Sequence, residues 1–173
     1  MNSFAQWLST TFPSVFLQMH ESWMIPIIQS AHITGIGLAV GSALMMTLRL
    51  LGRVGTDQSL QATERRYGPW LTGALWLLLV SGGLLIVAEP VRELVTFSFW
   101  LKMACVGVMV VVFATFQASV RSHGERWEQV LARRPAVRLA AVLTVVLWCC
   151  IIVLGRLIAY DHIWGHLSPA TKA

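Results

Sequence analysis

Five residues with side chains capable of ligand or redox chemistry lie within or beside long apolar runs of this sequence. They supply an imidazole, a carboxylate, an ammonium, a guanidinium and a phenol: His32, Glu89, Lys102, Arg156 and Tyr160. Ionisable groups in apolar surroundings are costly unless they pair with one another or face a polar site. If the five converge, two cations, an imidazole, a carboxylate and a phenol would suit an anionic or redox-active ligand.

Haem b is one ligand that fits this set. His32 would be the axial ligand of the iron, and Lys102 and Arg156 would face the propionates. His32 is the only histidine inside an apolar run, because the others lie outside: His20, His123, His162 and His166. The sequence therefore disfavours a haem held between two histidines. A haem with one histidine, or with Met103 as its second ligand, remains open.

A quinone is the other ligand that fits. His32 or Tyr160 would hydrogen-bond its carbonyl oxygen, and Glu89 would carry protons. The alternative to both ligands takes each residue separately. Lys102 and Arg156 would then extend to the membrane surface, Glu89 would be solvated, and His32 would hydrogen-bond to a neighbouring helix.

The remaining reactive residues do not form a complete motif. His162 and His166 are four residues apart and could share a metal ion, but two ligands do not complete a site, and an interfacial segment is the preferred interpretation. The three cysteines fall inside apolar runs, where cysteine usually acts as a small apolar residue. No nucleophile–base pair or phosphate-binding loop is present. The sequence therefore disfavours a stand-alone enzyme.

Four apolar runs must position the five residues. Of 173 residues, 56% are hydrophobic and 12% are charged, whereas a soluble domain carries about 25% charged residues. About 20 apolar residues cross ~30 Å of hydrocarbon, and four runs are long enough: 24–48, 70–88, 97–120 and 136–160. The sequence predicts an all-α integral membrane protein, with residues 1–173 forming one four-helix transmembrane domain.

Basic residues predict the orientation in the membrane. Nine arginines follow the first and third runs: Arg49, Arg53, Arg65, Arg66, Arg121, Arg126, Arg133, Arg134 and Arg138. Such loops are usually cytoplasmic, so both termini should lie outside, which is the periplasm if the source is a Gram-negative bacterium. The arginines are divided between two loops, which disfavours nucleic-acid binding. The five polar residues then fall in the outer half, and the inner half carries only Gln117 and the loop arginines.

Local signals refine this arrangement. Residues 1–20 lack the features of a cleavable signal peptide, and their weak amphipathic pattern, interrupted at Pro13, predicts a helix lying at the outer membrane interface. Gly37 and Gly41 form a GxxxG pair, which favours close helix packing. Pro69 is expected in the first turn of the second spanning helix, where its missing N–H costs nothing.

Several short segments also carry a family resemblance. They are 32–41 followed by 48–52, then 69–70, 89–90, 99–102 and 155–160. In these segments the chain resembles an uncharacterised family of small bacterial inner-membrane proteins with four spans. The resemblance implies the fold and topology and no established activity. Members often carry a histidine where Gln117 aligns, which would remove an inner-side ligand here. The plan is also distantly similar to membrane cytochromes b and copper-resistance membrane proteins, an analogy of fold only.

The sequence thus predicts a multi-pass protein of the bacterial inner membrane. Its expected role is a redox-associated subunit that binds haem b or quinone in its outer half, with the lipid bilayer and other membrane or redox subunits as partners. Two alternatives remain open. One is a component of a small-anion transporter, which would need an oligomer because four spans are few. The other is a non-catalytic assembly or scaffold subunit of a membrane complex.

Overall fold

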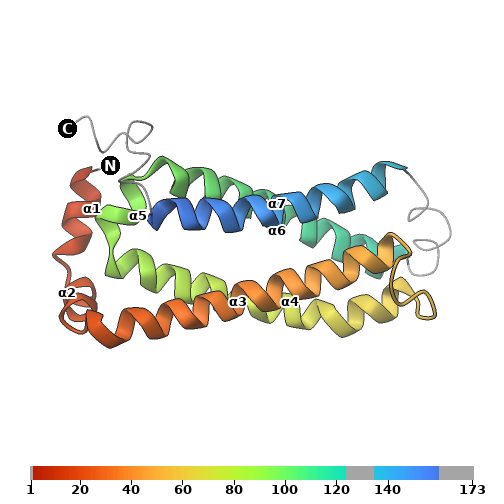
Figure 1. Cartoon of the computed structure of the whole chain (residues 1–173), viewed down its shortest axis with the longest axis horizontal. Coiled ribbons are helices and arrows are strands. Elements are labelled where there is room, and N and C mark those ends of the chain that lie inside the picture. The colour runs from red at the N-terminus through yellow and green to blue at the C-terminus, as the bar shows by residue number, and fades with distance from the viewer. Residues whose placement is uncertain (1, 124–134, 160–173) are drawn as a thin grey trace.

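The computed structural model describes residues 2–123 and 135–159, and every regular element in these ranges is a helix. The helices are α1 (Asn2–Ser9), α2 (Phe12–Met19), α3 (Glu21–Leu50), α4 (Leu60–Ala88), α5 (Pro90–Val95), α6 (Phe97–His123) and α7 (Pro135–Ala159). Helices α3, α4, α6 and α7 form an elongated bundle (Figure 1). The prediction of an all-α four-helix bundle is confirmed.

The bundle has two distinct ends. At one end, here called the α5 end, α3 begins, α4 ends, α6 begins and α7 ends (Figure 1). At the other, the Gly52 end, residues 51–59 join α3 to α4. Gly52 and Gly55 have φ angles of +70° and +65° in this loop. Glycine adopts this left-handed conformation without the steric penalty that a Cβ atom brings, so the chain reverses direction there.

The outward faces of the four long helices are apolar. Ile33, Trp76, Val111 and Val153, one on each long helix, are more than half exposed. The interior is formed by alanines, larger aliphatic side chains and one tryptophan: Ala39, Ala43, Met46, Leu71, Ala74, Met109, Trp148 and Ile151. All four helices are long and apolar enough to cross a membrane. A continuous exposed apolar surface on such helices is what a lipid bilayer covers. The chain is therefore a multi-pass membrane protein.

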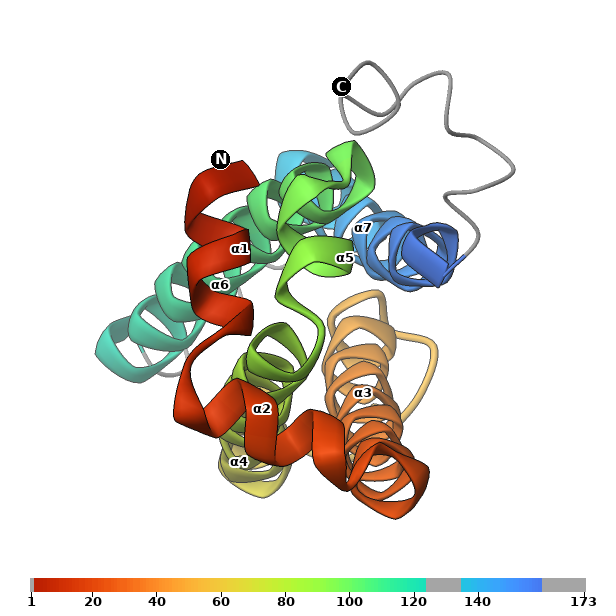
Figure 2. The same ribbon diagram turned by 90° about the vertical axis from the view of Figure 1, so that its left-hand side faces the viewer.

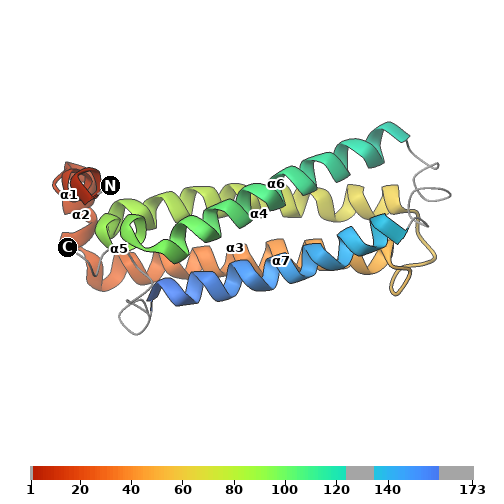
Figure 3. The same ribbon diagram turned by 90° about the horizontal axis from the view of Figure 1, so that it is seen from above.

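The four helices associate as two pairs. Helices α3 and α4 pack along their length, and α6 and α7 form the second pair; α6 is tilted relative to the other three (Figure 3). The close approach of α3 to α4 occurs at Gly35, where an added Cβ would lie 3.1 Å from Cδ2 of Leu78. An added Cβ at Gly37 or Gly41 would meet nothing within 4 Å. The expectation that this GxxxG pair packs against another helix is wrong.

Two short helices, rather than one, precede the first span. Helices α1 and α2 lie across the α5 end of the bundle (Figure 2), where α1 contacts α5 and α2 contacts α4. They are separated because Thr11 is extended and Pro13 occupies the first turn of α2, a position that tolerates its missing N–H. Several of their aromatic side chains are exposed: Phe4, Trp7, Phe12 and Phe16. Their location at a membrane interface stays a prediction.

Helix α4 begins earlier than its apolar run. Its N-cap is Ser59, whose Oγ accepts a hydrogen bond of 3.1 Å from the backbone N–H of Ala62. Pro69 therefore lies inside the helix, and its expected position in the first turn is wrong. The polar segment before Pro69 extends the helix because a capping side chain satisfies the backbone at Ser59, and the helix continues past the proline.

Replacing Gly35 with leucine will separate α3 from α4. The larger side chain must displace Leu77 and Leu78, and overpacking of this kind costs about 1–3 kcal/mol. Gly37→Leu is the matched control, because it gains the same helix propensity at a position with open space. Thermal unfolding in detergent should show a lower midpoint for Gly35→Leu than for Gly37→Leu. Equal midpoints would contradict the close approach at Gly35.

Candidate functional site

His32 on α3 hydrogen-bonds to Ser81 on α4. The distance from His32 Nδ1 to Ser81 Oγ is 2.8 Å, and Ser81 Oγ lies 2.6 Å from the carbonyl oxygen of Leu77. A carbonyl oxygen only accepts, so the serine donates its one proton to Leu77. His32 Nδ1 must then be the donor to Ser81. In the neutral imidazole this leaves Nε2 without a proton and with a free lone pair.

Glycine at position 82 makes room for the imidazole ring. A Cβ atom on Gly82 would lie 3.3 Å from Cε1 and 3.8 Å from Nδ1 of His32. The 3.3 Å distance is shorter than most Cβ contacts in proteins. The ring is half-buried. Gly82 leaves space for the ring, and the hydrogen bond to Ser81 fixes the ring against α4.

Lys102 on α6 brings the second helix pair to the same region. Its side chain is half-buried, and its Cδ lies 3.8 Å from where a Cβ on Gly155 of α7 would stand. Lys102 is also close enough to His32 and to Glu93 on α5 to act on both electrostatically. Side chains of α3, α5 and α6 therefore converge near the α5 end, with α7 packed against the lysine stem.

Glu93 on α5 is the carboxyl group whose charge acts on Lys102. Burial raises the pKa of Glu93 above its usual value, and the neighbouring Glu89 carboxylate acts in the same direction, while Lys102 and Arg92 oppose the rise. A carboxyl group with a raised pKa is suited to hold and release a proton. Glu89 instead pairs with Arg92, with 2.8 Å between Oε2 and Nη1, and both side chains are partly exposed.

Two of the five predicted site residues, His32 and Lys102, are close enough to interact electrostatically, whereas Glu89 pairs with Arg92 and acts on Glu93. The side chain of Arg156 is exposed on α7, and Tyr160 lies outside the described residues. Ser81 and Glu93 were not among the predicted site residues. The signal for Glu93 was its spacing of four residues from Glu89, which placed a second carboxylate in the same short connection.

A second polar cluster lies near the Gly52 end. The carboxylate of Glu64 on α4 is only 4% exposed, and its Oε1 accepts hydrogen bonds from Nη2 and Nε of Arg121 on α6 at 3.0 and 3.2 Å. A Cβ on Gly68 would lie 2.9 Å from this oxygen and 3.1 Å from Nε2 of Gln117. The expectation that this half of the bundle carries only Gln117 and loop arginines is therefore wrong.

Metal ligands do not gather in the described part of the chain. Within residues 2–123 and 135–159, no group of three or more histidine, cysteine, aspartate or glutamate side chains is placed to hold a metal ion. The three cysteines, Cys105, Cys149 and Cys150, are not in disulfides.

Comparison with known proteins identifies the family. The model of DUF6644, a family of unknown function, matches residues 4–161. The chain belongs to DUF6644. No curated protein and no solved structure gives a significant match. The expected resemblance to an uncharacterised family is thereby confirmed, and the DUF6644 match spans the whole cluster around His32, Ser81, Glu93 and Lys102.

Replacing Ser81 with alanine will remove the acceptor that fixes the His32 tautomer. The wild-type ring should carry its proton on Nδ1, because Ser81 Oγ can only accept from it. In Ser81→Ala the ring should populate both neutral tautomers, which nitrogen-15 NMR of labelled imidazole distinguishes. Ser81→Thr keeps a hydroxyl and should keep the tautomer. A wild-type ring protonated on Nε2 would contradict the assigned direction of this hydrogen bond.

Substitutions around Glu93 will move its pKa in opposite directions. Lys102→Met should raise it further and Arg92→Gln should raise it less, whereas Glu89→Gln should lower it, since each removes the charge that now acts on the carboxyl. Infrared titration of the carboxyl band measures these shifts.

The raised pKa of Glu93 also predicts how stability depends on pH. Because the folded-state pKa exceeds the usual 4.5, the contribution of Glu93 to the free energy of unfolding is present below pH 4.5 and is lost as pH rises through the folded pKa. Glu93→Gln should flatten that part of the stability profile.

Proposed function

We propose that this protein is a redox-associated membrane subunit that binds a quinone or haem b near the α5 end, with His32 as the residue that contacts the ligand. The supporting observation is the direction of the bond to Ser81. Since Nδ1 donates to Ser81 Oγ, the lone pair of Nε2 is left for a ligand. Histidines that bind metals or accept ligand hydrogen bonds are typically oriented by a hydrogen bond that the other ring nitrogen makes to the protein.

The neighbouring charges suit the same ligand. The Lys102 ammonium would attract a carbonyl, phenolate or propionate oxygen, and the half-buried Glu93 carboxyl would hold a proton beside it. Arg156 would extend the site on the fourth span, and Glu89, paired with Arg92, would adjust the charge on Glu93. Imidazole, ammonium and carboxyl then supply an acceptor, a donor and a proton carrier, the groups that proton-coupled chemistry of a quinone needs.

Of the two ligands, quinone is the better fit. His32 is the only histidine within the four candidate spans of the described residues, so a haem would need a weaker second ligand such as Met103 or an open position. A quinone needs only hydrogen-bond partners. Nε2 of His32 would accept from the hydroxyl of the reduced form, and Lys102 would donate to an oxygen of the oxidised form.

We further propose that the α5 end faces the periplasm. The Gly52 end carries the arginine-rich segments that usually stay in the cytoplasm. Both termini and the exposed aromatic residues of α1 and α2 would then lie on the outer side, with the two short helices at the interface. A site at this end would exchange electrons with other redox subunits through the outer half of the bilayer.

Extraction and spectroscopy of the purified protein test the proposed function. Wild-type protein in mild detergent should yield quinone on solvent extraction, and oxidised and reduced visible spectra report whether haem b is bound instead. His32→Ala should lower the recovered ligand about tenfold, as expected for a lost hydrogen bond or iron ligand. His20→Ala is the matched control, because His20 lies outside the bundle and bonds to the Phe16 carbonyl.

Two outcomes would overturn the proposal. Absence of both a Soret band and bound quinone from the wild-type protein would exclude the redox role. Ligand recovery that is unchanged in His32→Ala would show that the ligand is bound elsewhere. A cellular function that also survives replacement of His32 would favour the scaffold role in a larger membrane complex.

A further inference from the structure

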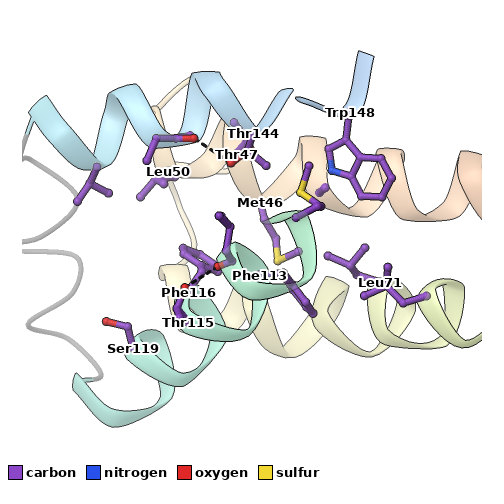
Figure 4. A pocket seen from close by; sticks show the side chains of 17 residues that line it. Met46, Thr47, Leu50, Leu71, Phe113, Thr115, Phe116, Ser119, Thr144 and Trp148 are labelled. Carbon is purple, nitrogen blue, oxygen red and sulfur yellow. Dashed lines mark hydrogen bonds between the residues drawn. The ribbon is translucent and has the colours of Figure 1, made fainter. Parts of the chain in front are cut away.

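A cavity of about 410 Å³ lies between the two helix pairs, on the Gly52 side of His32. All four long helices line it, and its walls are mainly apolar and aromatic, including Met46, Leu71, Phe113, Phe116 and Trp148 (Figure 4). The volume falls in the range of small-molecule sites, about 300–1,000 Å³. The cavity shares no lining residue with the cluster around His32.

Trp148 contributes a polar group that nothing in the described protein satisfies. The side chain is 6% exposed, and its Nε1–H is buried without a hydrogen-bond partner. Figure 4 shows the nitrogen on the side of the indole that faces the other lining residues. Buried donors are nearly always paired, so an unpaired indole N–H at the wall of a cavity points to a ligand with an acceptor atom.

Two of the hydroxyl groups that line the cavity are already used as donors within their own helices. Thr144 donates to the carbonyl oxygen of Ala140 at 2.8 Å, and Thr115 donates to that of Val111 at 2.9 Å. Each hydroxyl proton is thereby used within its own helix, as is common for threonine in spanning helices. The Trp148 N–H has no such bond, so a bound molecule with an acceptor atom would find it free.

The depth of Trp148 decides between classes of ligand. It lies 13 residues after Pro135 and 11 before Ala159 on α7, near the middle of the span. The ester oxygens of a phospholipid lie at the edge of the hydrocarbon core, ~15 Å from its centre. A phospholipid would have to carry its headgroup into the hydrocarbon to reach this N–H. A carbonyl compound that is soluble in hydrocarbon reaches it without that cost.

The cavity is also accessible from the side. Val112, Thr115 and Ala140 line it and are exposed on α6 and α7. In a membrane these positions face acyl chains, since the exposed surfaces of both helices are apolar. A lipid-soluble molecule would enter laterally from the bilayer and would need no aqueous path.

We propose that this cavity binds the ring of a lipid-soluble quinone, with the Nε1–H of Trp148 donating to a quinone carbonyl oxygen. Phe113 and Phe116 would pack against the flat ring. The inference does not rest on the proposed function of the His32 cluster, because it uses a different donor, different helix faces and a different depth. Either site can bind a ligand if the other does not.

Photolabelling of the full-length protein with a short-tailed azidoquinone tests the inference. Labelled peptides should include residues 109–119 of α6 or 137–148 of α7, and excess unlabelled quinone should remove the label. Trp148→Phe should reduce this labelling about tenfold, because it removes the donor and keeps an aromatic ring. Trp76→Phe, at an exposed position outside the cavity, is the matched control and should label like the wild type.

A second variant covers the case in which Trp148→Phe does not fold. Ala140→Leu adds a side chain at the exposed rim of the cavity and should block labelling while the bundle stays intact. Label confined to peptides around His32 and Lys102 would overturn this inference and support the proposed function. Label at α6 and α7 that neither variant reduces would overturn it as non-specific partition from the detergent.

Discussion

The close approach of α3 to α4 is the constraint on which the rest of the structure depends. In a bilayer the lipid is as apolar as the helices, so small residues and interhelical hydrogen bonds must hold spans together. Gly35 leaves space for Leu78, whose Cδ2 would lie only 3.1 Å from an added Cβ, and Gly82 leaves space for the imidazole of His32. The 2.8 Å bond from His32 to Ser81 forms only because the backbones are this close. The tautomer of His32, and with it the free lone pair on Nε2, follows from helix packing.

The second helix pair, α6 and α7, packs less closely against the first pair than α3 and α4 pack against each other. At the α5 end, α6 and α7 approach the first pair through Lys102 and Gly155. Towards the Gly52 end, a cavity separates the pairs, and the Glu64–Arg121 ion pair joins α4 to α6 beyond it. The seam between the pairs is thus polar near both ends and apolar in the middle. The two proposed ligand sites lie along this seam, with Nε2 of His32 at one and the Nε1–H of Trp148 at the other.

The sequence predicted the four long apolar helices, and it predicted that His32 and Lys102 lie in the same half of the bundle. Apolar runs identify spanning helices because the hydrocarbon core sets their length, and His32 and Lys102 were placed on the same side for that reason. Rotation about the helix axis was not predictable. Both faces of α3 are apolar, so hydropathy does not say that Gly35 rather than Gly37 meets α4. Glu93 and Glu64 were missed because their burial depends on tertiary contacts, and the unpaired N–H of Trp148 is visible only once its surroundings are known.

The unequal burial of the spans has a consequence for how sequences of this family diverge. In the most apolar window of α3, 44% of residues are buried inside the protein, against 11% in α6. Most of α6 is not buried inside the described protein and would face the bilayer, where one apolar side chain can replace another at little cost. Substitutions should therefore accumulate fastest along α6 and slowest along α3. On α6, the positions that change least should be the few that face inward, Lys102 and Met109 among them. Within this one helix, substitution should therefore be frequent at positions that face the bilayer and rare at positions that contact other helices.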